Sequence, residues 1–301
     1  MSVHNDHHDD DHDLGFAHDL PRLIGRRHLL AALGGAGLVA AASPAAAGCV
    51  ALPWETQGPY PADGSNARAG QVLNVLTQQG VLREDIRSSF GDLSGTADGP
   101  QLDLELVLVS ADGCTPLAGH AIYVWHCDAA GDYSLYNLPD QNFLRGVGIS
   151  DEAGLVRFTS IFPGCYDGRW PHIHFEIFAT PEAAVSGAQS VLTAQIALPG
   201  DICAALYASD PRFAGSTANL DRLTLQSDNV FGDNTPEELA QQTLVMSGDA
   251  GAGYQGRVTI PVDFNADRTV SMGPGGPGGP RGPGGPPPGA DGGMPPPPPS
   301  N

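Results

Sequence analysis

Two histidines, His172 and His174, are separated by a single residue in the segment HIHFEIF. In an extended strand, residues i and i+2 project from the same face, so both imidazoles point the same way. Two imidazoles on one face supply half of a metal site. The pair taken alone also fits two structural or surface histidines, because imidazole is polar and often half exposed.

Two tyrosines lie in turn-rich segments that can reach this pair. Tyr166 precedes His172 by six residues, in a stretch whose Gly and Pro residues indicate a structured loop. Such a loop can fold back onto the strand that follows it. Tyr133 comes after a Gly turn that ends another β-rich run, residues 121–126.

The elements that must position these residues are predominantly strands. Short alternating or apolar runs are bounded by turn signals and predict strands over residues 102–109, 121–126, 154–162, 172–178 and 258–262. Short helices are expected near residues 202–208 and 236–243, and long amphipathic stretches are absent. The predicted fold is mostly β: a two-sheet β-sandwich with few short helices.

Composition divides the chain into three segments, residues 1–48, 49–271 and 272–301. The first contains paired arginines, a short apolar run and a small-residue stretch, and it resembles a twin-arginine export signal. An uncleaved N-terminal anchor is the alternative. The Pro/Gly-rich third segment cannot bury a core and is expected to be disordered. About 220 residues remain for one folded domain.

Export would place the protein in the periplasm or outside the cell. The apolar run near the N-terminus is too short to predict a stable membrane span in the mature form. A lipid anchor at Cys49 is a minor alternative. The chain carries 34 Asp and Glu against 14 Lys and Arg, a formal charge of −20. Such an acidic protein is repelled by a phosphate backbone, which argues against a nucleic-acid partner.

Five cysteines lie at positions 49, 114, 127, 165 and 203. An exported protein can form disulfides. A bridge between Cys165 and Cys203 would rigidify the loop that carries Tyr166, so it is the first expectation. A bridge between Cys49 and Cys114 is the second, and it leaves Cys127 free and buried.

Six motifs, in this order, resemble the intradiol ring-cleavage dioxygenases, and more narrowly their exported single-domain members. The motifs cover about residues 52–200; they are residues 55–60, 124–128, 131–134, 143–146, 151–154 and 163–175. The resemblance implies the β-sandwich core of that family. It also implies cleavage of catechol-type rings between the two hydroxyl-bearing carbons with O2. The implied product is a muconate-type diacid, as in the degradation of aromatic compounds.

The resemblance further implies one non-haem Fe(III) per chain, bound by Tyr133, Tyr166, His172 and His174. Anionic phenolate oxygens are hard ligands that favour ferric iron, and imidazoles complete the set. A bound cation must lower the tyrosine pKa from its ordinary value of about 10. An open coordination position would admit the substrate.

Catalytic roles follow from the same resemblance. Tyr166 corresponds to the tyrosinate that leaves the iron and accepts a catechol proton. Arg169 corresponds to the arginine that stabilises charge on the ring, and would be a rare local positive charge in an acidic domain. Gln195 corresponds to a glutamine beside the substrate. The implied pocket residues are Gly58, Pro59, Tyr60 and Trp170, and Tyr60 and Trp170 could equally serve packing.

Two other function classes compete with this interpretation. A β-sandwich binding module without redox iron has no use for two tyrosines, two histidines and Arg169 together. A zinc hydrolase built on the HxH pair lacks an obvious third carboxylate ligand beside it, and paired tyrosinates are unusual for zinc. The particular catechol and the oligomeric state are left open, with a homodimer among the options.

Overall fold

The structure is a computed structural model, and it describes residues 49–270. The expected export signal, residues 1–48, and the Pro/Gly-rich segment 272–301 lie outside the described residues. All elements below belong to the described part of the chain.

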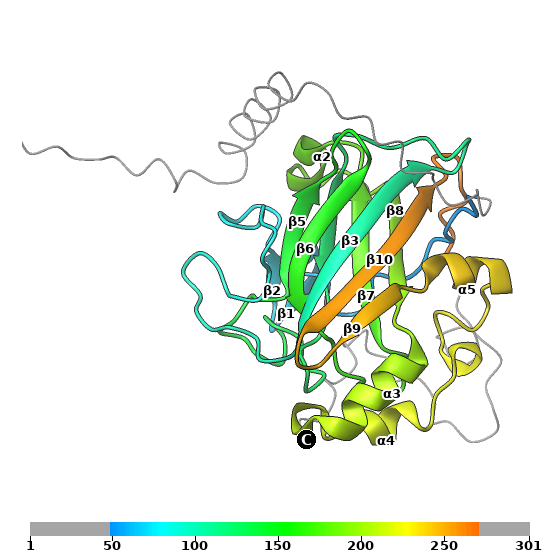
Figure 1. Cartoon of the computed structure of the whole chain (residues 1–301). Coiled ribbons are helices and arrows are strands. Elements are labelled where there is room, and N and C mark those ends of the chain that lie inside the picture. Colours follow the sequence, from blue (N-terminus) through cyan, green and yellow to red (C-terminus); the bar gives the residue numbers. More distant parts are fainter. Residues whose placement is uncertain (1–48, 271–301) are drawn as a thin grey trace, which may run out of the picture.

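Two four-stranded sheets form the body of the molecule, with strand orders β6-β3-β10-β9 and β5-β4-β7-β8 (Figure 1). Neighbouring strands are antiparallel except β3 and β10, which are parallel. A separate hairpin pairs β1 (Asp63–Arg68) with β2 (Gln71–Asn74). The sandwich strands are β3 (Gln101–Ser110), β4 (Ala121–Trp125), β5 (Arg145–Ile149), β6 (Leu155–Ile161), β7 (His172–Phe178), β8 (Leu192–Ala197), β9 (Val245–Asp249) and β10 (Gly253–Val262).

Alternating apolar residues fill the space between the sheets. In β3, residues Leu102, Leu104, Leu106 and Leu108 are at most 1% exposed, while the residues between them are mostly half-buried. Apolar residues of β7 and β10 belong to the same core. This alternation is the period-two pattern of a strand with one face in a core. The mostly β, two-sheet fold expected from the sequence is therefore confirmed.

The sheet that contains β7 is buried on both faces, and every residue of β7 is buried. Ile173, Phe175 and Ile177 face the core between the sheets. His172 and His174 alternate with them and so project from the opposite face. A second apolar cluster, which includes Tyr60, Trp125 and Tyr133, lies on that side of the sheet. The histidines thus lie inside a buried layer.

Short helices lie at both ends and along one edge of the sandwich (Figure 1). The two helices expected from the sequence are present as α3 (Gly200–Ser209) and α5 (Pro236–Gln242). The others are α2 (Pro181–Val185) and α4 (Ser216–Leu220), with 3-10 turns at Pro211–Phe213 and Leu225–Ser227. None of the helices in residues 49–270 is both long and apolar enough to cross a membrane.

Candidate active site

Four side chains bring their polar atoms together on the outer face of β7. The Tyr133 hydroxyl lies 3.4 Å from Nε2 of His172 and 3.2 Å from Nε2 of His174. The Tyr166 hydroxyl lies 3.2 Å from Nε2 of His172, and the two Nε2 atoms are 3.0 Å apart. The structure therefore unites the two tyrosines and the two histidines that the sequence singled out.

The histidines are fixed by strand pairing and by contacts of their rings. β7 lies between β4 and β8, and His174 faces Trp125 on one side and Gln195 on the other. The Trp125 indole stacks on the His174 ring, with centroids 4.9 Å apart and planes inclined by 3°. Nδ1 of His172 lies 2.5 Å from the carbonyl oxygen of Trp170. Both ring planes are thereby set before any ligand binds.

Tyr133 is held by the tight turn that follows β4. The Asp128 carboxylate accepts hydrogen bonds from the backbone N–H groups of Ala130 and Asp132, both at 2.9 Å. The backbone N–H of Tyr133 donates to Oδ1 of Asn137 at 3.1 Å. Local side-chain bonds of this kind stabilise turns that leave a strand.

Tyr166 is held by the loop before β7 and by α4. The Cys165 N–H donates to the Ser216 hydroxyl at 2.9 Å, and Asn219 donates to the Cys165 carbonyl at 2.8 Å. Gly131, with φ of +95°, packs against Tyr166 so closely that an added Cβ would lie 3.1 Å from the Tyr166 Cβ. The turn that carries Tyr133 and the loop that carries Tyr166 are therefore in direct contact.

The four converging atoms fit a bound cation. The Trp170 carbonyl can only accept, so Nδ1 of His172 carries the proton and its Nε2 presents a lone pair to the cluster. An ion with ligands at about 2.1 Å has adjacent ligand atoms about 3.0 to 3.4 Å apart, for bond angles from 90° to tetrahedral. The separations of 3.0 to 3.4 Å match this range.

Burial sets the protonation of these ligand candidates. It lowers the pKa of His172 to about 3 and that of His174 well below its ordinary value. It raises the pKa of Tyr166 to about 12 and that of Tyr133 well above its ordinary value. Both imidazoles are therefore neutral at pH 7 and available as ligands. The tyrosines need a cation in the site to lose their protons.

Arg169 and Gln195 lie together beside the tyrosines. Nη2 of Arg169 donates to Oε1 of Gln195 at 2.6 Å, and Nε donates to Oδ2 of Asp228 at 3.0 Å. Burial opposes the charge of Arg169, but Tyr166 and Asp228 outweigh it and raise the Arg169 pKa. The guanidinium is therefore charged, and its hydrogen bonds to Gln195 and Asp228 hold it in place.

Two of the four predicted pocket residues lie against the cluster. Gly58 has φ of +70°, and a Cβ added there would lie 3.2 Å from Cε1 of His174. Tyr60 is 5% exposed, and its ring centroid lies 4.8 Å from that of Tyr133. Gly58 permits the close approach of the backbone, and Tyr60 packs on one of the tyrosines.

The other two predicted pocket residues make different contacts. The Pro59 carbonyl accepts a hydrogen bond from Asn66 at 2.6 Å. The Trp170 indole N–H donates to the Leu198 carbonyl at 2.9 Å, and its ring lies against Gly200 at the start of α3. The Trp170 indole therefore lies against the segment between β8 and α3, and it also packs against the cluster of Ala197, Val230 and Phe231.

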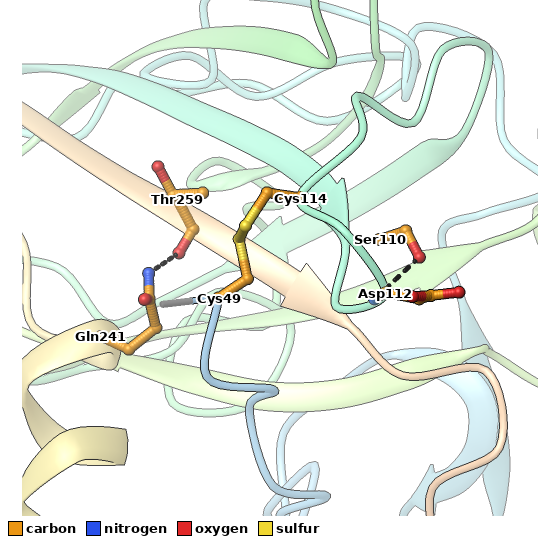
Figure 2. Close-up of a disulfide and its surroundings, with 6 residues drawn as sticks. All are labelled: Cys49, Ser110, Asp112, Cys114, Gln241 and Thr259. Carbon is orange, nitrogen blue, oxygen red and sulfur yellow. Dashed lines mark hydrogen bonds between the residues drawn. A yellow bond between two sulfur atoms is a disulfide. The ribbon is translucent and has the colours of Figure 1, made fainter. Parts of the chain in front are cut away.

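The disulfide expectations divide. Cys49 and Cys114 form a disulfide that ties the first described residue to the turn after β3 (Figure 2). The expected Cys165–Cys203 bridge is wrong, because both thiols are free and buried. The Cys165 sulfur lies 3.5 Å from the Arg169 carbonyl, and Cys203 is enclosed in the core between the sheets. Cys127 is free and buried, as expected.

Two buried carboxylates at the site were missed by the sequence reasoning. Asp228 is fully buried and accepts hydrogen bonds from Arg169 and from the backbone N–H of Trp170 at 2.7 Å. Glu55 is 3% exposed and accepts from the backbone N–H of Gln195 at 2.9 Å. Asp228 lies in a turn-rich segment without strand or helix periodicity, where an aspartate is ordinarily read as a surface turn residue. Glu55 begins the motif at residues 55–60, but its partner Gln195 lies 140 residues away in the sequence.

Across residues 49–270, His, Cys, Asp and Glu side chains form no group of three or more suited to hold a metal. The cluster on β7 instead combines two histidines with two tyrosine hydroxyls. Its members are Tyr133, Tyr166, His172 and His174.

A family model described as "Dioxygenase" matches residues 90–211 of the chain. This interval contains the four converging side chains together with Arg169 and Gln195. The chain is also 44% identical over 55 residues to a chlorocatechol 1,2-dioxygenase from Rhodococcus opacus. That match covers 18% of this chain and 21% of the relative, so it spans about a fifth of the relative's length.

The fold is shared with an intradiol ring-cleavage dioxygenase from Tetranychus urticae, with a TM-score of 0.53. The sequence identity is 22%, and the similarity covers 72% of this chain and 96% of the other. The family match falls on the segment that builds the site, and the shared fold extends well beyond it. The chain therefore matches a dioxygenase family model over the segment that builds the site, and it has the fold of an intradiol ring-cleavage dioxygenase.

Proposed function

We propose that this chain is a non-haem iron dioxygenase that opens catechol-type rings between the two hydroxyl-bearing carbons with O2, giving a muconate-type diacid. One observation carries the proposal: four buried or half-buried ligand atoms from Tyr133, Tyr166, His172 and His174 converge at 3.0 to 3.4 Å. The local similarity to a chlorocatechol 1,2-dioxygenase supports a catechol-type substrate.

Tyr133, Tyr166, His172 and His174 would hold one ferric ion. Two hard phenolate oxygens and two neutral imidazoles suit ferric iron better than zinc. When bound, the iron would supply a Lewis-acid centre for the two catechol oxygens and redox contact with O2.

The two tyrosines differ in burial, and this difference assigns their roles. Tyr133 is 0% exposed and packs under Tyr60, whereas Tyr166 is half-buried on a loop. Tyr133 is therefore the permanent ligand candidate. Tyr166 is free to give up its place, and its Oη accepts a proton from the entering catechol. A group that acts as a base must lie within hydrogen-bond reach of the proton it takes.

Arg169 supplies positive charge next to the reacting region. Its charge and that of ionised Tyr166 attract each other, because the two groups are neighbours in a buried site. When Tyr166 takes up a proton, the guanidinium remains to stabilise negative charge that develops on the catechol ring. Its bonds to Gln195 and Asp228 keep it in place, so no reorganisation is needed during the reaction.

Metal content and colour test this proposal. The purified chain loaded with ferric iron should retain about one iron per chain and show a visible tyrosinate-to-iron charge-transfer band. Catechol should then cause O2 uptake. A chain that binds no iron, or that stays colourless and takes up no O2 after loading, would contradict the proposal.

A further inference from the structure

Gln195 lies on the outer edge of its sheet, where no strand follows β8 in the described part of the chain. Backbone groups on this edge instead form hydrogen bonds with other segments of the chain. The backbone N–H of Glu55 donates to the Thr193 carbonyl at 2.9 Å, and the N–H of Leu244 donates to the Ala197 carbonyl at 2.9 Å. The carbonyls of Thr193 and Ala197, two residues before and after Gln195, therefore accept hydrogen bonds from the backbone of other segments.

At Gln195 itself, side chains replace the missing strand. Its backbone N–H donates to Oε2 of Glu55 at 2.9 Å, and its carbonyl accepts from Nε2 of Gln242 at 2.7 Å. Oε1 of Glu55 in turn accepts from Gln242 at 2.6 Å and from Asn234 at 3.0 Å. Both backbone groups of Gln195 are thereby fixed by one connected buried network.

The Gln195 side chain extends from this fixed backbone toward the site. Its Nε2 donates to the Thr56 carbonyl at 2.9 Å, and its Oε1 accepts from Arg169 at 2.6 Å. The segment that contains Glu55 and Thr56 therefore holds Gln195 twice, once by the backbone and once by the side chain. Two residues later, Gly58 contacts His174.

The Glu55 side chain accepts hydrogen bonds on both of its oxygens, which packing alone would not require. The three partners of this side chain are the backbone N–H of Gln195 and the side-chain amides of Asn234 and Gln242. All three donate an N–H. A glutamine at this position would place an NH2 group against at least one of those donors. Buried polar networks of this kind rigidify when every member is satisfied.

We infer that Glu55 is a positioning residue, which fixes Gln195 and through it the guanidinium of Arg169. The inference rests on the proposed function, because the positioned group matters only if Arg169 acts on the reacting catechol. It assigns to the segment before the first strand a direct part in building the site.

The test compares Glu55→Gln with the wild-type chain. We expect kcat for catechol to fall between about tenfold and about a hundredfold, because small displacements of a charge-stabilising group are costly. The charge-transfer band should persist, because none of the four ligand candidates is changed. Backbone hydrogen exchange at Gln195 should quicken, because the amide of the variant can place an NH2 group against the Gln195 N–H where Oε2 of Glu55 now accepts from it.

A double-variant cycle separates positioning from general stability. If Glu55 acts through Gln195, then adding Glu55→Gln to Gln195→Ala should lower kcat little further than Gln195→Ala alone. If the two substitutions acted independently, their fold-reductions in kcat would multiply instead. Multiplying effects, or an unchanged kcat in Glu55→Gln, would overturn the inference.

Glu176→Gln is the matched control. Glu176 is also buried, at 4% exposed, and its recorded side-chain partner is the Thr193 hydroxyl at 3.3 Å, outside the Arg169 network. It should leave kcat and the Gln195 exchange rate near the wild-type values. If Glu55→Gln does not fold, Gln242→Ala removes donors to both Glu55 and the Gln195 carbonyl, and an unchanged kcat there would overturn the inference.

Different results would contradict the proposed function and the positioning role of Glu55. A wild-type chain that binds iron but cleaves no catechol would defeat the proposed function. Hydrogen exchange at Gln195 would still report whether Glu55 holds it. An active wild type whose Gln195 exchange and kcat do not respond to Glu55→Gln would defeat only the positioning role.

Discussion

The two tyrosines at the site have unequal surroundings, and this inequality is the most informative feature at the scale of single residues. Tyr133 is buried in the second apolar cluster, where its ring packs against Tyr60, while Tyr166 is half-buried on a loop. In the proposed function, the same residue type serves two roles. A permanent ligand must resist displacement, and a proton acceptor must be able to move.

Tyr166→Phe tests this division. We expect kcat for catechol to fall by at least about a hundredfold, since positioned acid–base groups contribute rate factors of that order. The thermal unfolding midpoint should change little, because the variant keeps the aromatic ring that packs against its neighbours. Steady-state kinetics and an unfolding scan give both values. A variant with a much lower unfolding midpoint but a wild-type kcat at temperatures where it is folded would show that Tyr166 is a packing residue.

The Arg169–Asp228 pair makes a second prediction at the residue scale. Asp228→Asn should lower the free energy of unfolding by about 3 kcal/mol at pH 7, because it leaves a buried guanidinium without its counter-ion. Denaturant unfolding measures this loss. Asp167→Asn is the control, since its ion pair with Arg222 is exposed and should contribute less than about 1 kcal/mol.

The effect of Asp228→Asn should also depend on pH. Burial opposes the charge of Asp228, but Arg169 and backbone N–H donors outweigh it and lower the Asp228 pKa below its ordinary 3.8. The stability that the ionised carboxylate provides is therefore present above pH 3.8 and is lost as the pH falls through the lower folded value. A difference between variant and wild type that grows on acidification would contradict the assigned pairing.

Sequence reasoning reached the residues of the site that local spacing identifies. His172 and His174 share a strand face, and Tyr133 and Tyr166 follow recognisable turns and motifs. Glu55 and Asp228 escaped because their partners are distant: 140 residues separate Glu55 from Gln195, and 59 separate Arg169 from Asp228. No local pattern encodes a contact of that length.

At the scale of elements, strands with a regular apolar pattern were predictable. β3 alternates, and β4, β6, β7 and β10 are rich in β-branched or aromatic residues. β5 was not predicted, because its sequence RGVGI contains two glycines and resembles a turn. Tertiary packing requires both of them: a Cβ at Gly146 would lie 2.5 Å from Cγ2 of Ile86, and a Cβ at Gly148 would lie 2.3 Å from Cγ1 of Val156.

The disulfide makes the prediction at this scale. Cys49 and Cys114 are 65 residues apart, and closing a loop of that size stabilises a chain by about 4 kcal/mol on the chain-entropy model. Replacing both by serine should therefore lower the free energy of unfolding by up to about that amount. Because residues 52–60 run from this bridge to the site, the double variant should also lose activity at a lower temperature.

Cys203→Ala is the matched control for the disulfide. Cys203 is a free, buried thiol, so this variant should keep the loss of stability that reductant causes in the wild type. The double serine variant should show no such response to reductant. A wild type whose unfolding is indifferent to reductant would contradict a stabilising role for the bridge.

At the scale of the whole molecule, the chain carries a net charge of −20, and the proposed function places a cation in its site. The sequence suggested that Arg169 would stand as a local positive charge. The structure modifies this expectation, because Asp228 lies 3.0 Å from the guanidinium and balances it. The guanidinium beside the tyrosines is thus part of a buried ion pair and not the source of a broad positive field.

The product formed from catechol under heavy-isotope O2 tests the central claim most directly. Opening between the hydroxyl-bearing carbons by a dioxygenase predicts a muconate-type diacid whose mass shows both heavy oxygen atoms. Mass spectrometry of the iron-loaded chain's product measures this. A hydroxymuconic semialdehyde, which results from cleavage beside the two hydroxyl-bearing carbons, or recovery of intact catechol would contradict the account.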